Sequence, residues 1–266
     1  MYPFKYHRPT SLEEAASLYN GSDDPVYLSG GMTLIPTMKQ RLAAPADVID
    51  LSGIESLTGI SVKGDKLTIG AFTTHAAVMA SADVRKHIPV LAYLAAQIGD
   101  AQVRNRGTIG GSVANSDPSA DYPAAIVSLG TTIHCQNRSI DGTEFFKDLF
   151  ETALEPGEII TSIEFSMPTR AAYRKFPNPA SRYAVVGVLV ADFGGSIRVG
   201  VTGAGPCACR ASGMEKVLND NLKPAAIDAV EVPDAGFNSD LHASAEYRAH
   251  LVKVMAKRAV AAMLEG

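Results

Sequence analysis

The sequence contains two glycine-bearing stretches, Leu28-Ser29-Gly30-Gly31-Met32-Thr33-Leu34-Ile35 and Thr108-Ile109-Gly110-Gly111-Ser112-Val113-Ala114-Asn115. Glycine lets backbone N–H groups approach a phosphate closely, and hydroxyl side chains flank the glycines in both stretches. Taken singly, either stretch is explained by a tight turn. Taken together, they favour one diphosphate bound from two sides, and therefore a dinucleotide.

Neither stretch has the spacing of the common nucleotide motifs. The sequence lacks the G-x-G-x-x-G of a Rossmann site and the G-x-x-x-x-G-K-[ST] of a P-loop. The first stretch follows a short apolar run, residues 26–28, and leads into a helix-compatible segment, residues 33–42. A helix N-terminus at this point would add a partial positive charge that favours an anion.

The elements around the first stretch predict a small α/β unit. A capping pattern at Thr10 and Ser11 precedes apolar residues at helical spacing up to Tyr19, and residues 47–51 resemble a second strand. Beyond Ser52 the pattern changes to α+β. It predicts a hairpin at 60–69, helices at 74–81 and 83–98, a loop at 107–115, an apolar segment at 122–129, and strands at 131–136 and 159–165.

The C-terminal part predicts a sheet covered by helices. Apolar runs at 184–193 and 197–202, joined by Gly194-Gly195, indicate an antiparallel pair. Helical segments are expected at 212–218, 224–230 and 244–264. The change of pattern near residues 168–171 gives the expected domains: 1–170, with subdomains 1–53 and 54–170, and 171–266.

Composition indicates a globular protein. Of the 266 residues, 46% are hydrophobic and 20% charged, and the net charge of -4 gives no reason to expect nucleic acid or an anionic membrane as partner. The sequence has no apolar run of the roughly 18–20 residues that span a bilayer. The N-terminus has no apolar stretch of signal-peptide length, so we expect a cytoplasmic protein.

The cysteines and histidines predict no metal site and no catalytic site. The three cysteines (Cys135, Cys207 and Cys209) are too few for a disulfide framework or an iron–sulfur cluster, and Cys207-x-Cys209 has no second ligand pair. The six histidines are scattered without metal-ligand spacing. No histidine–carboxylate constellation suggests a general acid or base.

Several motifs resemble one known family. They are Ser29-Gly30-Gly31-Met32-Thr33, Thr108-Ile109-Gly110-Gly111-Ser112, Asn115-Ser116-Asp117-Pro118-Ser119-Ala120-Asp121-Tyr122-Pro123, Pro3-Phe4-x-Tyr6-x-x-Pro9-Thr10-Ser11, Gln102-Val103-Arg104-Asn105-Arg106-Gly107 and Pro156-Gly157-Glu158-Ile159-Ile160. Together they resemble the molybdenum hydroxylase flavoproteins, which include the flavin domains of xanthine dehydrogenases and, with the greatest likeness, the medium subunits of aerobic carbon monoxide dehydrogenases.

The resemblance implies a fold and a cofactor. The fold is α+β: a PCMH/VAO-type FAD-binding fold of two α/β subdomains, followed by a C-terminal α+β domain of the CO dehydrogenase flavoprotein type. FAD would lie extended between these parts. The cofactor-binding residues implied are Leu28, Ser29, Gly30, Gly31, Met32, Thr33, Leu34, Ile35, Ile98, Thr108, Ile109, Gly110, Gly111, Ser112, Asn115, Asp117, Asp121, Ile160, Lys175 and Tyr183.

For four of these residues, a purely structural role is an open alternative to the role that the resemblance implies. Asp121 would accept from ribose or adenine-side hydroxyls, or cap the helix expected after it. Ile98 would pack against the cofactor, or belong to the core. Lys175 would place a positive charge near the flavin and raise its potential, or be a solvated strand lysine. Tyr183 would cover one face of the ring, or be a core tyrosine.

Other implications concern chemistry and partners. Many relatives have histidine and serine where this chain has Met32 and Thr33, which leaves the substrate class open. Neither stretch has a histidine or cysteine for covalent flavin attachment. The resemblance implies a large molybdopterin-cofactor subunit, which oxidises the substrate, and a small [2Fe-2S] subunit, which relays electrons, in a heterotrimer that is often doubled. Ile160 would lie near the isoalloxazine.

Two other functions remain open at the level of sequence. One is a self-contained flavin reductase or oxidase of the same superfold, which would need its own substrate pocket and proton donor. The other is a binding module that kept the fold and lost FAD. The substrate of the partner is also open, because carbon monoxide, purines, nicotine-type heterocycles and aromatic acids are all served by relatives.

Overall fold

The N-terminal unit is a small parallel sheet with helices packed on it, and the computed structural model describes residues 1–265. Its strands lie in the order β1-β3-β2, and both neighbouring pairs are parallel. The elements are β1 (Lys5–His7), α1 (Leu12–Asn20), β2 (Pro25–Leu28), α2 (Leu34–Lys39) and β3 (Asp47–Asp50). The predicted capping box is confirmed: Ser11 accepts from the Glu14 amide, and Glu14 accepts from the Thr10 amide.

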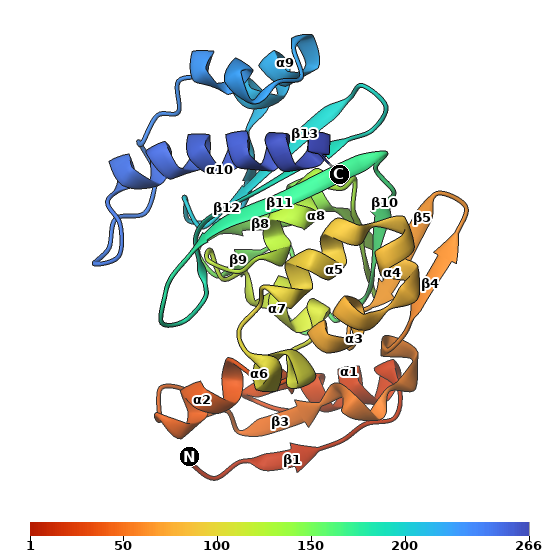
Figure 1. Cartoon of the computed structure of the whole chain (residues 1–266). Helices are drawn as coiled ribbons and strands as arrows, with labels where there is room; N and C mark the ends of the chain where they lie inside the picture. The colour runs from red at the N-terminus through yellow and green to blue at the C-terminus, as the bar shows by residue number, and fades with distance from the viewer. Residues whose placement is uncertain (266) are drawn as a thin grey trace.

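The middle unit is an antiparallel sheet with the order β4-β5-β10-β6-β7, and helices cover one of its faces (Figure 1). The strands are β4 (Ile60–Lys63), β5 (Lys66–Gly70), β6 (Thr132–Cys135), β7 (Ser139–Asp141) and β10 (Ile160–Ser166). The helices are α3 (His75–Ala80), α4 (Ala82–His87), α5 (Pro89–Ala96), α6 (Ala101–Arg106), α7 (Ile109–Asn115) and α8 (Tyr122–Ser128). A short hairpin, β8 (Phe146–Asp148) with β9 (Glu151–Thr152), precedes β10.

The C-terminal unit is a second antiparallel sheet, ordered β11-β12-β13-β14, which lies between helices. Its elements are β11 (Arg170–Pro177), β12 (Ala184–Asp192), β13 (Ile197–Thr202), β14 (Cys209–Arg210), α9 (Ser212–Asp220), a 3-10 helix (Pro224–Ala229) and α10 (Ala245–Glu265). Figure 1 shows α10 lying along this sheet. All nine residues of β12 are buried, which explains the unbroken apolar run that predicted it.

One glycine explains how the middle unit meets the C-terminal sheet. A Cβ added to Gly200, in β13, would collide with the carbonyl oxygen of Ala124, in α8. Helix α8 can therefore lie directly against the sheet only because residue 200 has no side chain. The whole of α8 is buried, and it joins the core of the middle unit to the face of the sheet opposite α10.

Four sequence expectations differ from the structure. The helix expected at 83–98 is two helices, because Ile88 before Pro89 is forced out of the helical conformation. Strand β11 and helix α6 were not expected as elements, since charged residues interrupt their apolar patterns. The segment 224–230 is a 3-10 helix rather than an α-helix. The second glycine stretch is the helix α7 rather than a loop.

A candidate dinucleotide cavity between the two glycine stretches

The two glycine stretches lie in contact, although about eighty residues separate them. The hydroxyls of Ser29 and Thr108 are hydrogen-bonded at 2.7 Å. Gly30 lies against the backbone of α6, and a Cβ added to it would collide with the carbonyl oxygen of Arg106. The close approach therefore requires glycine at position 30 and joins the N-terminal unit to the middle unit.

A single cavity of about 730 Å³ opens beside this contact and lies within the size range of ligand sites. All the implied cofactor residues line it except Ile35, Ile109 and Lys175. Ile109 is fully buried in the core, and Ile35 packs behind Gly31. The residues that line the cavity from the candidate set are Leu28, Ser29, Gly30, Gly31, Met32, Thr33, Leu34, Ile98, Thr108, Gly110, Gly111, Ser112, Asn115, Asp117, Asp121, Ile160 and Tyr183.

The first stretch offers free backbone donors to this cavity. Among residues 1–265, no group accepts a hydrogen bond from the amides of residues 30–33. Gly31 has φ of 73°, a left-handed conformation that glycine adopts without strain. These amides precede the first turn of α2, where the helix dipole adds partial positive charge. The arrangement matches the geometry that anions prefer at a glycine turn.

The second stretch offers hydroxyl groups instead of amides. The amides of Ile109 and Gly110 donate to the carbonyls of Thr73 and Ala71, at 3.0 and 2.8 Å. The amide of Gly111 donates to the Thr108 hydroxyl, which caps α7. Only the first stretch is therefore a set of free amides, and the expectation of two facing backbone loops is corrected on this point. The glycines of α7 allow helix and strand to pack closely, since a Cβ on Gly110 would lie 2.5 Å from that of Ala71.

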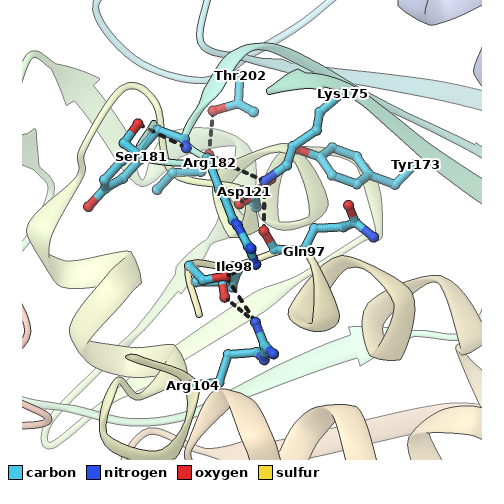
Figure 2. Close-up of polar contacts among 12 residues, drawn as sticks. Gln97, Ile98, Arg104, Asp121, Tyr173, Lys175, Ser181, Arg182 and Thr202 are labelled. Carbon is cyan, nitrogen blue, oxygen red and sulfur yellow. Dashed lines mark hydrogen bonds and ion pairs between the residues drawn. The ribbon is translucent and has the colours of Figure 1, made fainter. Parts of the chain in front are cut away.

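A buried ionic cluster adjoins the cavity through Asp121, which lines it, and Figure 2 shows Asp121, Tyr173 and Lys175 close together. Asp121 accepts from the Tyr173 hydroxyl at 2.5 Å, and its carboxylate lies 3.0 Å from the Lys175 ammonium. Both side chains of the ion pair are 4% exposed. Burial raises the pKa of Asp121, and the Lys175 charge and the hydrogen bonds of the cluster oppose that rise.

The cluster excludes two of the structural roles that the sequence left open. Asp121 stands before α8 but makes no side-chain hydrogen bond to the helix amides, so the capping alternative is wrong. Lys175 is not a solvated strand lysine, and it does not reach the cavity either. Its ammonium donates to Asp121 at 3.0 Å, to the Gln97 carbonyl at 2.9 Å and to the Arg182 carbonyl at 2.8 Å. Lys175 is therefore enclosed by protein on all three donors.

The mouth of the cavity carries partly exposed side chains. Tyr183 lines the cavity and is 46% exposed, so it is not a core tyrosine. Met32 lies at the first stretch and is 39% exposed. Tyr183 follows the hairpin turn between β11 and β12, which brings the C-terminal unit to the cavity.

Sequence reasoning missed about half of the residues that line the cavity, and His75 and Arg182 are two of them. His75 begins α3, is 4% exposed, and its Nδ1 atom has no hydrogen-bond partner among the described residues. Burial lowers the pKa of His75 to about 4, so the imidazole is neutral near neutral pH. Nothing in its spacing distinguished it from the other scattered histidines. Arg182 lies in a turn whose place over the cavity depends on tertiary structure.

The described residues hold no group of three or more metal-ligating side chains that could bind a metal ion. Within the same residues, no helix is both long enough and apolar enough to cross a membrane.

Comparison with known proteins gives matches along the whole chain. Residues 2–168 match the model of the FAD binding domain in molybdopterin dehydrogenase, and residues 171–263 match that of the CO dehydrogenase flavoprotein C-terminal domain. The medium chain of carbon monoxide dehydrogenase from Afipia carboxidovorans is 35% identical, over 97% of this chain and 95% of its own. The nicotine 6-hydroxylase medium subunit of Paenarthrobacter nicotinovorans is 34% identical, over 96% and 95%.

Solved structures agree with the sequence matches. A chain in a crystal structure of a Cu,Mo-CO dehydrogenase superposes with a TM-score of 0.91 at 34% identity, over 99% of both chains. A chain of the quinoline 2-oxidoreductase from Pseudomonas putida 86 superposes with a TM-score of 0.90 at 28% identity, over 100% of this chain and 99% of that one. The expected fold class is confirmed by these matches.

Proposed function

The chain belongs to the FAD-binding medium subunits of the molybdenum hydroxylases, and from this we propose that it accepts electrons from an iron–sulfur subunit and passes them to an external acceptor. The family is shown by the match of residues 2–168 and by relatives that are more than 30% identical over nearly the full chain. FAD, when bound, supplies the redox chemistry, and the protein fixes its position, potential and access.

One observation carries the proposal: the hydroxyl contact between Ser29 and Thr108, which places free amides and hydroxyls on one wall of a single cavity. A dinucleotide needs a diphosphate site and a long, mostly apolar slot beside it. The amides of residues 30–33 and the Ser112 hydroxyl suit the diphosphate. Apolar side chains such as Ile98 and Ile160 suit the ring system. The residues present therefore fit FAD.

We assign the cofactor contacts to the candidate residues that line the cavity. The first stretch would bind the diphosphate, and Thr108 and Ser112 would add hydroxyl donors. Asp121 would accept from a cofactor hydroxyl at its remaining lone pairs. Tyr183 would cover the ring at the mouth and limit the access of oxygen. Lys175, enclosed by the protein, would act behind the cavity wall rather than as a direct ligand.

The partners proposed are a large subunit with the molybdenum cofactor and a small subunit with [2Fe-2S] clusters. This is supported by the relatives, which are named as medium chains or medium subunits. The assembly we propose is a heterotrimer of these three subunits, alone or doubled, and we place it in the cytoplasm.

Carbon monoxide is the substrate we propose for the assembly, because two carbon monoxide dehydrogenase medium chains are 35% and 34% identical to this chain. A nicotine-type heterocycle is the second candidate, because the nicotine 6-hydroxylase medium subunit is 34% identical. The two identities are almost equal, and the experiment below therefore offers both substrates.

The test is to purify the full chain with and without its partner subunits. We expect a yellow protein with one FAD per chain in the complex, no turnover by the lone chain, and activity of the complex with an artificial acceptor. Carbon monoxide and nicotine, offered separately, distinguish the two substrates. Flavin-dependent turnover by the chain alone would refute the relay function, and a complex without FAD would refute the cofactor. Cell fractionation tests the location.

A further inference from the structure

The cavity has an unusual balance of charge. Four side chains of Asp, Glu, Lys or Arg line it within the described part of the chain: Asp117, Asp121, Glu158 and Arg182. Glu158 is held by Arg138 through two hydrogen bonds of 2.7 Å, and Asp121 is paired with Lys175. Arg182 is the one lysine or arginine among the lining residues that the structure describes. Any positive side-chain charge that a ligand contacts in this cavity therefore comes from Arg182.

Lys175 cannot supply the positive charge that a ligand in this cavity contacts. An ammonium group has three donors, and those of Lys175 are all used, by Asp121 and by two backbone carbonyls. Its charge is offset at 3.0 Å by a carboxylate in the same buried cluster. A charge neutralised by a buried partner exerts little field on a third group nearby.

The protein fixes the backbone of Arg182 firmly. Its carbonyl accepts from Lys175 at 2.8 Å, and its amide donates to the Asn178 carbonyl at 2.9 Å. Its φ of 63° is left-handed, a conformation that is uncommon for a residue with a side chain. The turn is thus held in one unusual shape by the cluster behind it, and that shape decides where the side chain goes.

The guanidinium group of Arg182 retains free donors. It makes one hydrogen bond, of 3.2 Å, to the carbonyl of Gly99, although a guanidinium has five N–H donors. Figure 2 shows the side chain running from the turn towards Ile98. The neighbouring cavity wall is formed by Ile98, Gly99 and Tyr183. The guanidinium therefore lies beside Ile98 and Tyr183, whose side chains suit a flat ring. The free amides of residues 30–33 are a separate feature of the same cavity.

We propose that Arg182 is the cationic ligand of the flavin ring, with its guanidinium directed at the ring's polar edge. This rests on the proposed function, because it presupposes that FAD occupies the cavity. Reduction of a flavin adds negative charge at this edge. A cation there stabilises the reduced cofactor more than the oxidised one, and so raises the reduction potential.

The experiment compares Arg182→Gln with the wild-type chain, each as the full chain purified with its partner subunits. Glutamine also carries a Cβ, so the strain of the left-handed turn is unchanged. Arg174→Gln is the matched control: Arg174 lies on β11, stacks over the Tyr93 ring and does not line the cavity. The measurements are the flavin midpoint potential, from a redox titration followed by flavin absorbance, and the affinities for FAD and for ADP.

We expect Arg182→Gln to weaken the binding of reduced FAD about tenfold relative to oxidised FAD, which for a two-electron couple lowers the midpoint potential by about 30 mV. Arg182→Lys keeps a charge and should recover part of the shift, and Arg174→Gln should leave the potential unchanged. ADP affinity should change little in any variant, since ADP lacks the ring.

Two results would overturn the inference while leaving the proposed function intact. One is an unchanged potential in Arg182→Gln that binds FAD normally. The other is an equal loss of affinity for FAD and ADP, which would assign the guanidinium to the diphosphate. If neither the wild-type complex nor Arg174→Gln binds FAD, the proposed function itself is wrong, and the inference is wrong with it.

Discussion

Removal of the Lys175 ammonium tests the buried cluster most directly. In Lys175→Met, the Asp121 carboxylate would remain buried without its counter-charge, at a site where it is 4% exposed. Removing one partner of a buried ion pair lowers the free energy of unfolding by about 3–5 kcal/mol. An independent limit comes from protonation: bringing a carboxyl with an ordinary pKa of about 3.9 to its neutral form near pH 7 costs about 4 kcal/mol. The two values agree, so we expect a loss of about 4 kcal/mol.

This cost depends on pH in a defined direction. In Lys175→Met the folded chain favours protonated Asp121, so the pKa of that carboxyl lies above its value in the unfolded chain. The folded variant then gains stability as the pH falls, and the deficit relative to wild type shrinks by about 1.4 kcal/mol per pH unit. Near pH 5 the deficit should be about 1.5 kcal/mol.

The assay is urea unfolding followed by far-UV circular dichroism, at several pH values, for a double-mutant cycle. We expect Asp121→Asn with Lys175→Met to be more stable than Lys175→Met alone, because the double variant buries no unpaired charge. Arg174→Met, which removes a partly exposed charge from the same strand, is the control and should cost under about 1 kcal/mol. A deficit that does not depend on pH, or single effects that simply add, would refute the reasoning.

Three further predictions follow from single residues. Gly30→Ala should weaken FAD binding at least about tenfold in a fluorescence titration, because the added Cβ collides with the Arg106 carbonyl oxygen. Gly213→Ala is the control: its added Cβ has only an ordinary contact of 3.5 Å, and the variant should bind FAD as the wild-type chain does. Burial lowers the pKa of His75 to about 4, so the imidazole gains a proton at higher pH in the unfolded chain than in the folded chain. The wild-type chain should therefore lose about 3 kcal/mol of unfolding free energy between pH 6.5 and 4. His75→Gln should not show this loss. Equal acid sensitivity of the two would contradict this. Ser11→Ala should lower the unfolding free energy by about 1 kcal/mol in urea, because the amide at the start of α1 loses its acceptor, and Ser11→Asp should retain most of it.

Much of the fold follows from local sequence. Helix α1 is predicted by its capping residues at Thr10 and Ser11, and the structure contains both hydrogen bonds of the capping box. The pair β12 and β13 is predicted by two apolar runs joined by Gly194-Gly195. These signals succeed because the residues that carry them interact with neighbours only a few positions away.

The elements that the sequence did not predict depend on distant contacts. Strand β11 reads Arg170-Ala171-Ala172-Tyr173-Arg174-Lys175-Phe176-Pro177, with charges that argue against a buried strand. It forms because it pairs with β12, and because the charge of Lys175 meets Asp121, which lies more than fifty residues earlier in the chain. Local propensity carries no information about a partner at that separation.

The sequence alone determined that two glycine stretches exist, that each has hydroxyl neighbours, and that their motifs resemble those of one flavoprotein family. Local chemistry suffices for that, since glycine and serine at fixed spacing have the same backbone options in any fold. Only the tertiary structure decided that Ser29 meets Thr108, that the amides of the second stretch are already used, and that Arg182 rather than Lys175 lines the cavity. The physical reason is that a donor is available to a ligand only when no other part of the folded chain has taken it.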